Sequence, residues 1–498
     1  MRFPTWSLLL AITLFASCSD NSLIPRPNVL VITIDSLRAD RLGCYGYERK
    51  TSPNLDKLAS EGVLFERAYS HAPFTAPSHA SLLTSLHTKT HGVYAWAERL
   101  SSEAHNLAER LAPAGYRTGA FYNHPGLRTS QITRGFGEVQ ERFFEEASKT
   151  SSAFLDWVDN SQDEQPFAVW VHYWDVHRPY AFRDWRADYF EGHVEREPGQ
   201  ETVAYGEERF GEAQPPTTVQ VGRTEKVYNM NPKRRAERVA KLGAEHAQSD
   251  IEFIANRYDG GVWFADQGLG ELLEGLRTRG MLDNTLVVVT ADHGESLTER
   301  EACYFTHDPF LYEETLHVPL VIRLPGAEHA GERITSLTRL IDVIPTIHEV
   351  LDLALLGDEQ GQSLLPAIAG EKPDLTLLMA QTMTRNAKET GARVAKGKER
   401  WLEERTAISD GRFKAIHDIG KKRWELYDLQ SDPAEKHDLA SLAENAERLT
   451  SMRKALRLFD ATIPAAGAAS AEITGDLQDL LRGIGYIGEA PEEKEDQD

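Results

Sequence analysis

Three residues at two points of the sequence offer ligands for a divalent metal ion. Asp35 follows the apolar run NVLVITI, and the pair Asp292 and His293 follows the run NTLVVVTA. Neighbours in an extended strand point to opposite faces, so Asp292 and His293 can bind one ion only from the turn after the strand. Two carboxylates and an imidazole suit Ca²⁺, Mg²⁺, Mn²⁺ or Zn²⁺. Each residue alone is more often a cap or turn former, but their matching positions favour a metal site.

A group of hydroxyl side chains lies in the segment HAPFTAPSHASLLTS, residues 71–85. Pro77 suits the first turn of a helix, which makes Thr75 or Ala76 its cap. A hydroxyl at a helix start that also binds a divalent cation has its alkoxide stabilised by both. Thr75 is therefore either a nucleophile or an ordinary cap. The other hydroxyl groups are expected to pack within the helix, namely those of Ser78, Ser81, Thr84 and Ser85.

A third apolar run carries further polar side chains near its end. The segment PFAVWVHYWDVHRPY, residues 166–180, contains His172, Asp175 and His177. Helical segments lie between the three runs, for example over residues 54–68 and 265–280. Alternating buried strands and helices predict an α/β fold with a doubly wound, mostly parallel sheet flanked by helices. Ligands of such sheets bind beyond the carboxyl ends of the strands, where all three polar groups lie.

An ordered series of motifs over residues 27–440 resembles the sulfatase family, within the wider alkaline-phosphatase-like superfamily. The motifs are PNVLVITIDSLRADRLGCYGY, PSHASLLTS, AGYRTGAF, VHYWDVHRPY, RYDGGVWFADQGLGELLEGLRTRGMLDNTLVVVTADHGE, LYEETLHVPLVIRLPG, LIDVIPTIHEVL and WELYDLQSDPAEKHDLA. Such a series is far more specific than any single motif. The resemblance implies that Asp35, Asp292 and His293 bind the metal. It also implies that His177 faces the transferred group or the leaving oxygen.

The resemblance assigns weaker roles to several other residues. Ser36 stands where sulfatases often place a second aspartate ligand, and is a candidate metal ligand. His307 lies near the Lys/His segment of the family and is expected to contact the anion. His172 is a candidate substrate-binding residue, although a strand histidine is more often structural. Two-zinc relatives suggest a second metal held by Asp175, His177 and His307, but the spacing here differs.

Departures from the family pattern concern the nucleophile. The family motif has a cysteine or serine that is oxidised to formylglycine, followed by x-Pro-Ser-Arg. Here TAPSH puts Thr75 in the nucleophile position and His79 in the arginine position, so no formylglycine is expected. Asn123 replaces the sulfate-holding lysine, and Pro125 its histidine. The run also resembles the Thr-x-Pro-x-His motif of nucleotide pyrophosphatase/phosphodiesterases, in which a metal-bound threonine attacks phosphorus.

These observations predict a metal-dependent ester hydrolase that cleaves or transfers phosphoester, especially phosphodiester, groups through Thr75. Thr75, His177 and His79 are the expected catalytic residues, and Asn123, His307 and His172 the expected substrate-binding residues. Two alternatives remain open: a true sulfuric ester hydrolase that works without formylglycine, and a catalytically inactive envelope-binding lipoprotein of the sulfatase fold. The expected substrate is a small-molecule ester or an ester of an envelope glycan or lipid.

The charge balance restricts the partners. The chain of 498 residues carries 77 acidic and 55 basic side chains, a formal net charge of −22. Such a surface repels polyanions, so nucleic acid is not an expected partner. Three cysteines, Cys18, Cys44 and Cys303, form neither a disulfide framework nor a CxxC zinc motif.

The N-terminus has the pattern of a signal peptide, residues 1–17. Arg2 precedes the apolar run WSLLLAITLFA, and Ala16 and Ser17 precede Cys18. The segment FASC resembles a bacterial lipobox, in which the cysteine is acylated. We therefore expect a lipid-anchored protein outside the cytoplasm, in the periplasm or on the outer membrane. Plain secretion after Ser17 is the alternative.

The remaining chain divides by composition. Residues 18–26 are a linker, and residues 27–370 form the catalytic domain. A charged insertion at about 190–250 is either a lid over the site or a surface excursion. Residues 371–488 are expected to form a smaller C-terminal α+β subdomain with antiparallel strands, and residues 489–498 an acidic tail.

Overall fold

The computed structural model describes the part of the chain that holds all the predicted site residues. It covers residues 26–95, 98–161, 165–178, 180, 204–205, 217–218, 248–297, 299–300, 306–307, 309–371, 378–384, 403–465 and 469–470. The predicted signal peptide, Cys18, the acidic tail and most of the insertion lie outside these residues. No helix among the described residues is long and apolar enough to cross a membrane.

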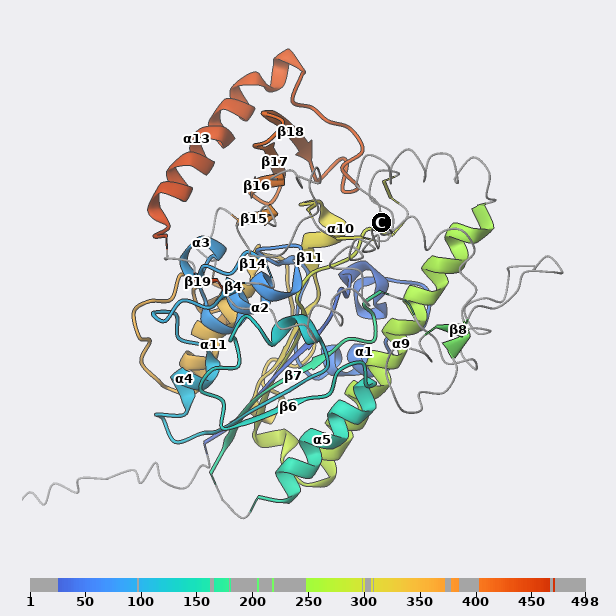
Figure 1. Ribbon diagram of the computed structural model, residues 1–498, viewed down its shortest axis with the longest axis vertical. Coiled ribbons are helices and arrows are strands. Elements are labelled where there is room, and N and C mark those ends of the chain that lie inside the picture. Colours follow the sequence, from blue (N-terminus) through green and yellow to red (C-terminus); the bar gives the residue numbers. More distant parts are fainter. Residues whose placement is uncertain are drawn as a thin grey trace, which may run out of the picture.

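An eight-stranded, mostly parallel sheet forms the centre of the molecule (Figure 1), as the sequence predicts. Its strands, in spatial order, are β13 (Arg333–Ile334), β2 (Val63–Phe65), β12 (Leu320–Arg323), β10 (Thr285–Ala291), β1 (Asn28–Ile34), β7 (Phe167–Tyr173), β5 (Arg117–Tyr122) and β6 (Glu138–Glu141). Only β12 runs antiparallel to its neighbours. The central strands β1, β7 and β10 are buried along their whole length, which explains their unbroken apolar runs.

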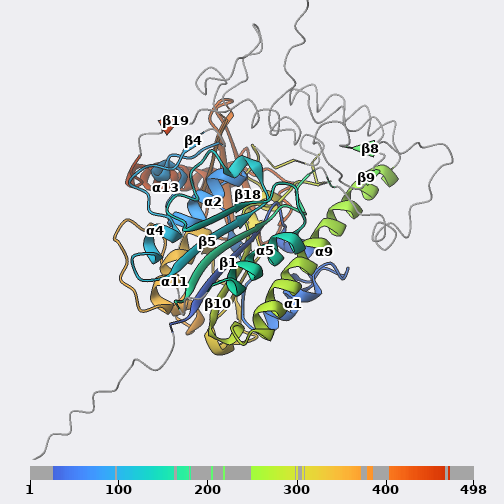
Figure 2. The same ribbon diagram turned by 60° about the horizontal axis from the view of Figure 1, so that its bottom comes forward.

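Helices cover both faces of this sheet. On one face α1 (Pro53–Ser60), α5 (Ala147–Asp159) and α9 (Gln248–Thr278) pack together. On the other, α2 (Thr75–Thr84), α3 (Thr88–His91) and α11 (Val343–Val350) pack together. Figure 2 shows the sheet between the two groups. The described chain also contains the short helices α4 (Leu107–Leu111), α10 (Glu313–Leu316) and α12 (Leu365–Ile368).

The helix predicted over residues 54–68 is wrong beyond Ser60. Helix α1 ends there, and the chain turns into β2, in which Val63 pairs with Ile322 of β12. The apolar residues of β2 are all buried in the sheet, which a helix presenting one face to the core would not achieve. The helix predicted over residues 265–280 is confirmed as the second half of α9.

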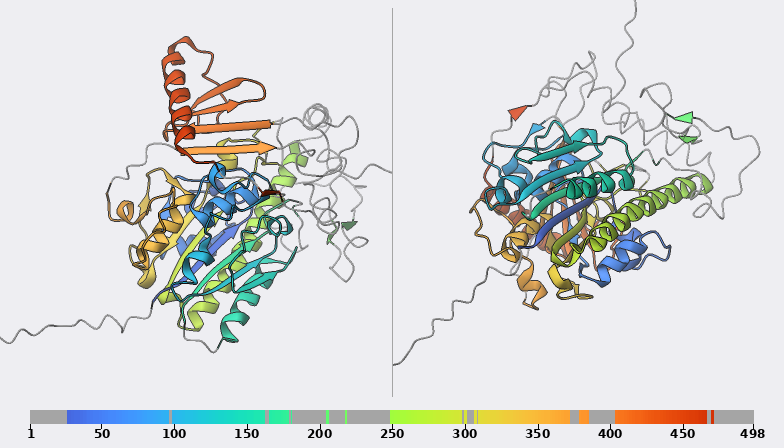
Figure 3. Two further views of the ribbon diagram at one scale, coloured as in Figure 1. Left: turned by 60° about the vertical axis from the view of Figure 1, so that its left-hand side comes forward. Right: turned by 90° about the horizontal axis from the view of Figure 1, so that it is seen from below.

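The predicted C-terminal subdomain contains an antiparallel sheet and a helix. Strands β15 (Leu378–Thr384), β16 (Glu403–Ser409), β17 (Phe413–Asp418) and β18 (Arg423–Asp428) pair in sequence order. Helix α13 (Ala446–Thr462) packs on β16 and β17 (Figure 3). Short strands complete the described structure: β3 (Ala68–Tyr69), β11 (His317–Val318), β14 (Thr338–Arg339), β4 (Glu98–Arg99), β19 (Ala469–Ser470), β8 (Ala204–Tyr205) and β9 (Thr217–Thr218).

Candidate active site and metal centre

The three predicted metal ligands meet at the carboxyl edge of the sheet. Strands β1 and β10 are parallel and end in register, with Ile34 opposite Ala291, so the residues that follow them lie side by side. The His293 Nε2 atom is 3.4 Å from Oδ2 of Asp292 and 3.9 Å from Oδ1 of Asp35. All three side chains are fully buried. Asp292 and His293 leave the strand before they converge, as the sequence argument requires.

Ser36 supports the carboxylates. Its backbone N–H donates to Oδ1 of Asp292 at 3.0 Å, and its hydroxyl donates to Oδ1 of Asp35 at 2.9 Å. A φ of 58° places Ser36 in the left-handed region, which is uncommon for a residue other than glycine. This turn ties the ends of β1 and β10 together. The geometry therefore makes Ser36 an orienting neighbour of the ligands.

The donor atoms at this edge fit a divalent cation. Oδ2 of Asp35 and Oδ2 of Asp292 are buried and have no hydrogen-bond partner among the described residues, which is costly for anions without a counter-ion. Burial raises the pKa of Asp35 to about 7, because its effect outweighs the lowering of this pKa by His293 and by the hydrogen bond from the Ser36 hydroxyl. Nδ1 of His293 donates to the Gly294 carbonyl at 2.8 Å, so the neutral form of this ring has its lone pair on Nε2.

Thr75 lies at the start of α2 and points toward this group. Its Oγ1 is 3.3 Å from Nε2 of His293, and the residue is 2% exposed. The N-cap position belongs to Phe74, so the expectation that Thr75 or Ala76 caps the helix is wrong. The cap lies one residue earlier because Phe74 is the last residue with an extended backbone, at φ −153° and ψ 138°.

The other hydroxyl groups of α2 are structural, as predicted. Ser78 donates to the Asp292 carbonyl at 2.5 Å, which ties the helix to the turn that carries the candidate metal ligands Asp292 and His293. Ser81 hydrogen-bonds to His91 at 3.0 Å, and Thr84 donates to the Ala80 carbonyl at 2.6 Å. Ser85 ends the helix in the left-handed conformation and donates to the Ile341 carbonyl.

His79 lies inside the helix–sheet junction. Its Nδ1 donates to the Thr75 carbonyl at 2.8 Å, and its Nε2 is 3.0 Å from the Thr33 hydroxyl. Burial lowers its pKa to about 3, so the ring is neutral. Nδ1 is also 3.7 Å from Oδ2 of Asp292. His79 therefore holds the start of α2 beside the metal ligands, and both of its ring nitrogens already have partners.

His172, His177 and His307 all lie around the same centre. Nε2 of His172 is 3.3 Å from Oδ2 of Asp35. The ring centroid of His307 is 4.3 Å from that of His293 and 5.8 Å from that of His177. Nδ1 of His177 donates to the Arg178 carbonyl, so its lone pair is on Nε2. The structure thus brings these three predicted site residues together.

Asp175 does not join them, so the grouping of Asp175, His177 and His307 as a second metal site is wrong. The Asp175 carboxylate accepts the backbone N–H of Ala147 at 3.0 and 3.1 Å, at the first turn of α5. This is a helix N-terminal role that spacing alone does not reveal. Two groups of ligand atoms within 4.8 Å do occur among the described residues: Asp35 with Asp292 and His293, and Asp35 with His124 and His177.

His124 is a site residue that the sequence reasoning missed. Its Nδ1 accepts the Gly126 N–H at 3.0 Å, so a neutral ring carries its proton on Nε2, which is 3.9 Å from Oδ2 of Asp35. Burial lowers the pKa of His124 well below its ordinary value, which keeps the ring neutral. Its position just after β5, at the same edge of the sheet, was the available signal. An N–H donor here suits an anionic oxygen.

Asn123 precedes His124 and faces partly away from the centre. Its side-chain NH₂ donates to the Glu145 carbonyl at 2.7 Å, whereas its buried Oδ1 has no hydrogen-bond partner among the described residues. Among the described residues, no hydrogen bond joins the Asn123 side chain to Asp35 or His293, the candidate metal ligands. It remains a predicted substrate-binding residue.

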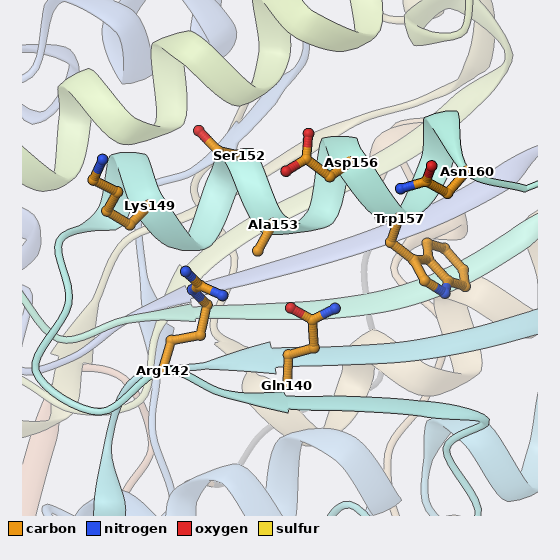
Figure 4. A pocket seen from close by; sticks show the side chains of 8 residues that line it. All are labelled: Gln140, Arg142, Lys149, Ser152, Ala153, Asp156, Trp157 and Asn160. Carbon is orange, nitrogen blue, oxygen red and sulfur yellow. The ribbon is translucent and has the colours of Figure 1, made fainter.

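Two surface cavities lie apart from this centre. One, of about 440 Å³, lies between β6 and α5 (Figure 4) and is lined by Gln140, Arg142, Lys149, Ser152, Ala153, Asp156, Trp157 and Asn160. The other, of about 820 Å³, lies between the catalytic domain and the C-terminal sheet, with Arg38, Glu313 and Arg412 among its lining residues. None of the predicted site residues lines either cavity.

Comparison with known proteins agrees with this geometry. Residues 27–353 match the sulfatase family model, and residues 301–461 match that of the C-terminal region of N-sulphoglucosamine sulphohydrolase. The mostly parallel α/β sheet with a metal-type ligand set at its carboxyl edge defines the alkaline-phosphatase-like class of proteins. The chain belongs to the sulfatase family, and its predicted resemblance to that family is confirmed.

Individual relatives are distant but similar over nearly their whole length. An N-acetylglucosamine-6-O-sulfatase of Bacteroides thetaiotaomicron is 24% identical over 89% of this chain and 88% of its own. The human N-sulphoglucosamine sulphohydrolase is 26% identical, over 87% and 89%. A phosphonate monoester hydrolase of Agrobacterium radiobacter has the same fold, with a TM-score of 0.68, 21% identity and coverage of 91% and 99%.

Proposed function

We propose that this protein is a metal-dependent hydrolase that cleaves phosphoesters, foremost phosphodiesters, with Thr75 as its nucleophile. The observation that carries the proposal is the position of the Thr75 hydroxyl, 3.3 Å from Nε2 of the metal-ligand candidate His293. Asp35, Asp292 and His293 would hold one divalent ion, and Thr75 would complete its ligand set. A bound divalent ion lowers the pKa of a coordinated hydroxyl and neutralises charge on a transferred phosphoryl group.

The chain's own groups account for the steps of the reaction. Thr75 Oγ1 forms a bond to phosphorus while the bond to the leaving oxygen breaks, and the hydroxyl proton passes through water to that oxygen, which leaves as the alcohol. Water then attacks the phosphothreonine, the Thr75 Oγ1–phosphorus bond breaks, and a proton of this water returns to Oγ1. The Nε2–H of His124 donates to a non-bridging oxygen. His177 presents its Nε2 lone pair to the incoming water.

The residues that replace the family pattern favour phosphorus over sulfur. Thr75 supplies a hydroxyl in place of the formylglycine precursor, and His79 is neutral where the family motif has an arginine cation. Asn123 contributes no charge in place of lysine. A site with two cations fewer is less suited to holding a sulfate ester for attack by the aldehyde hydrate of formylglycine. A metal-bound hydroxyl can attack without oxidation of the residue to an aldehyde.

A true sulfuric ester hydrolase is the second candidate, and the relatives favour it. The bacterial relative acts as an N-acetylglucosamine-6-O-sulfatase, and a solved structure with a TM-score of 0.68 and 21% identity was obtained in complex with D-glucosamine-2-N,6-O-disulfate. We propose on this basis that the alcohol side of the ester is a saccharide, or a similar polar group of the cell envelope.

We also propose that the protein acts outside the cytoplasm, anchored through an acylated Cys18. The support is the sequence LLLAITLFASC, which lies outside the described residues. Globomycin, which blocks lipoprotein signal cleavage, and the variant Cys18→Ala should both stop processing. Normal maturation of Cys18→Ala would contradict the anchor.

The catalytic proposal is tested by trapping the intermediate. The enzyme is mixed with a slow aryl phosphodiester, quenched in acid during turnover, and the peptide containing Thr75 is analysed by mass spectrometry. We expect a mass gain of one phosphoryl group on Thr75. Aryl phosphate monoesters and aryl sulfates are assayed side by side. Sulfate turnover that exceeds phosphoester turnover, with unmodified Thr75, would establish the second candidate instead.

A further inference from the structure

The cavity between β6 and α5 lies where a helix packs beside the edge strand of the central sheet (Figure 4). Its volume of about 440 Å³ is within the range of small-molecule sites in proteins, roughly 300–1,000 Å³. Gln140 and Arg142 line it from the strand side. They are two positions apart, so they share one face of the sheet, and Figure 4 shows both side chains pointing toward α5.

The opposite wall of the cavity is one stripe of α5 and its C-cap. The residues are three or four positions apart, which places them on one face of the helix: Lys149, Ser152, Ala153, Asp156, Trp157 and Asn160. The neighbouring stripe of α5 is buried in the core and includes Phe154 and Val158. A helix that closed on the strand would carry apolar side chains on the first stripe as well. Here that stripe is mostly polar, and a gap remains.

Trp157 is the one aromatic side chain in the lining. The Arg117 guanidinium lies over its ring, with Cζ 4.4 Å from the centroid, and the Phe121 ring centroid is 5.9 Å away. These contacts hold the half-buried indole in place at the cavity. A fixed tryptophan offers an apolar surface and an N–H donor at a low cost in conformational entropy. Apolar C–H groups beside polar hydroxyl groups are what a sugar ring presents.

The polar groups of the cavity are available to a ligand. Among the described residues, neither the Lys149 ammonium nor the Asp156 carboxylate makes an ion pair. The Arg142 guanidinium donates its Nε–H to Glu145 at 2.8 Å, and its other N–H groups are left for the cavity. The Asn160 amide can both donate and accept. Carboxylate, amide and cationic groups in one cavity can bind several hydroxyl groups of a sugar at once.

The two cations lie at the edge of the sheet that carries the candidate active site. Strands β1, β7, β5 and β6 run parallel, so their carboxyl ends share one edge. Arg142 directly follows β6, and its backbone N–H donates to the carbonyl of Tyr122, the last residue of β5, at 2.8 Å. Lys149 is near the start of α5, at this same edge, whereas Asn160 ends the helix at the opposite edge. The cationic end of the cavity is therefore the end closer to the catalytic centre.

We propose that this cavity binds a sugar unit of an acidic glycan, with the ring against Trp157 and a carboxylate or sulfate group at Arg142 and Lys149. Asp156 and Asn160 bind its hydroxyl groups. The inference goes beyond the proposed function, because it adds a saccharide site that takes no part in ester cleavage. Binding here raises the effective concentration of the other units of the same glycan at the candidate active site.

The net charge of −22 is compatible with an acidic ligand at this place. Repulsion between exposed charges is largely screened beyond about 10 Å at 0.1 M ionic strength, whereas the cavity cations would contact the ligand directly. The lining holds two cationic side chains, Arg142 and Lys149, against one carboxylate, Asp156. Added salt should therefore weaken the binding of an acidic oligosaccharide more than that of a neutral one.

The test compares three oligosaccharides by isothermal titration calorimetry on the full chain. An oligogalacturonate carries carboxylates, a sulfated dextran oligosaccharide carries sulfates, and maltoheptaose is neutral. We expect at least one of the two acidic oligosaccharides to bind at least tenfold more tightly than maltoheptaose. The comparison of the two acidic oligosaccharides shows which of the two anionic groups the cavity recognises.

Variants place the binding in this cavity. Arg142→Gln/Lys149→Gln should weaken the binding of the acidic oligosaccharide at least tenfold. Ala153→Leu fills the cavity without removing a polar group, and should weaken binding by at least the same factor. The control Lys454→Gln/Arg457→Gln removes two exposed cations from α13 and should bind as wild type does.

Folding and turnover are checked on the same preparations. Melting curves establish that each variant is folded. The turnover of a small aryl ester should equal that of wild type in all of them, because none of the changed residues lies at the candidate active site.

Two results would overturn the inference: no binding of either acidic oligosaccharide, or binding that both Arg142→Gln/Lys149→Gln and Ala153→Leu leave unchanged. Equal affinity for maltoheptaose would overturn the acidic character of the ligand. Thr75→Ala should bind the oligosaccharide as wild type does. A failed nucleophile is therefore seen in turnover and in the phosphothreonine assay alone, and a failed saccharide site in calorimetry alone.

Discussion

The Thr75 hydroxyl and Nε2 of His293 are 3.3 Å apart, although 218 positions of sequence separate the two residues. Thr75 is the first residue of α2, and His293 lies in the turn after β10. The bond from Ser78 to the Asp292 carbonyl fixes this helix start against the turn. The contact is thus set by the backbone of two elements, and the nucleophile candidate is pre-positioned at the candidate metal ligands.

Replacement of Thr75 separates a nucleophile from a helix residue. Thr75→Ala removes the attacking oxygen and should lower kcat on an aryl phosphodiester by about 10³-fold or more. Thr75→Ser keeps a hydroxyl without the methyl group and should retain part of the rate. Steady-state kinetics and melting curves are measured on the same preparations. Thr84→Ser, the same change at the other end of α2, is the control and should be indistinguishable from wild type.

An undiminished rate in Thr75→Ala would mean that this residue only begins the helix. A rate lost equally in Thr75→Ser and Thr75→Ala would also contradict nucleophilic attack, if both proteins are folded.

The centre of the site could be predicted from the sequence because the ends of buried strands can be recognised there. Asp35 and Asp292 each end an unbroken apolar run, and parallel strands in register must bring such ends together. The hydrogen-bond partners of side chains in loops cannot be predicted from the sequence in this way. Asp175 has the spacing of a ligand but accepts the Ala147 N–H. His124 follows a strand just as Asp35 does, but the resemblance to the sulfatase family assigns a role to its neighbour Asn123 and none to His124.

Local helix patterns were similarly ambiguous. Residues 54–68 have helical apolar spacing throughout, yet the chain leaves the helix after Ser60 because Val63 finds a partner strand in β12. This partner residue, Ile322, is more than 250 positions from Val63 in the sequence, so the local pattern of residues 54–68 cannot predict the pairing. The position of the cap at Phe74 is another tertiary effect, since apolar side chains rarely cap helices.

Removal of a metal ligand should reduce metal binding more than folding. Asp35→Asn and Asp292→Asn each replace a buried carboxylate at the site by an amide of the same shape. We expect bound metal to fall by at least one equivalent, with loss of activity, while the far-ultraviolet circular dichroism is kept. Metal content is measured after gel filtration in metal-free buffer.

Asp175→Asn is the matched control for these two variants. The same chemical change at the start of α5 keeps an oxygen for the Ala147 N–H, so metal content should equal that of wild type. Wild-type metal content and turnover in both Asp35→Asn and Asp292→Asn would refute the assignment of the metal site.

Lys414 joins the C-terminal sheet to the catalytic domain. Its ammonium is 3.1 Å from a carboxylate oxygen of Glu313 and 3.1 Å from one of Glu435, and its side chain is 2% exposed. Lys414→Met leaves two carboxylates buried without their cation, which should cost about 3–5 kcal/mol in the free energy of unfolding. Urea denaturation measures this loss. The exposed pair of Arg412 with Asp428 is the control, and Arg412→Met should change stability little.

The double variant Lys414→Met/Glu435→Gln tests the electrostatic cause of this loss. Burial raises the pKa of Glu435 to about 7 and outweighs the opposite effect of the Lys414 ammonium, which lowers this pKa. A neutral amide at position 435 removes one of the uncompensated carboxylates, so the double variant should be more stable than Lys414→Met alone. A double variant that is less stable would attribute the loss to packing.

Acid sensitivity should come from a group of buried histidines near α3. The ring centroid of His87 is 4.9 Å from that of His71 and 5.4 Å from that of Phe459 of α13. Burial, and then the charge of Arg339, lower the pKa of His87 from 6.5 to about 3. The unfolded chain therefore takes up a proton at a higher pH than the folded protein does. The stability contributed by neutral His87 is complete above pH 6.5 and is lost as the pH falls toward 3.

Within that range His87 should contribute a slope of about 1.4 kcal/mol per pH unit to the free energy of unfolding. His87→Gln cannot take up this proton, so its stability should fall less steeply between pH 6 and 4 than that of wild type. Urea denaturation at a series of pH values measures both slopes. His437, whose side chain is 80% exposed, is the control position, and His437→Gln should keep the wild-type slope. Equal slopes in His87→Gln and wild type would show that His87 is already protonated in the folded protein, which its position against Phe459 and His71 argues against.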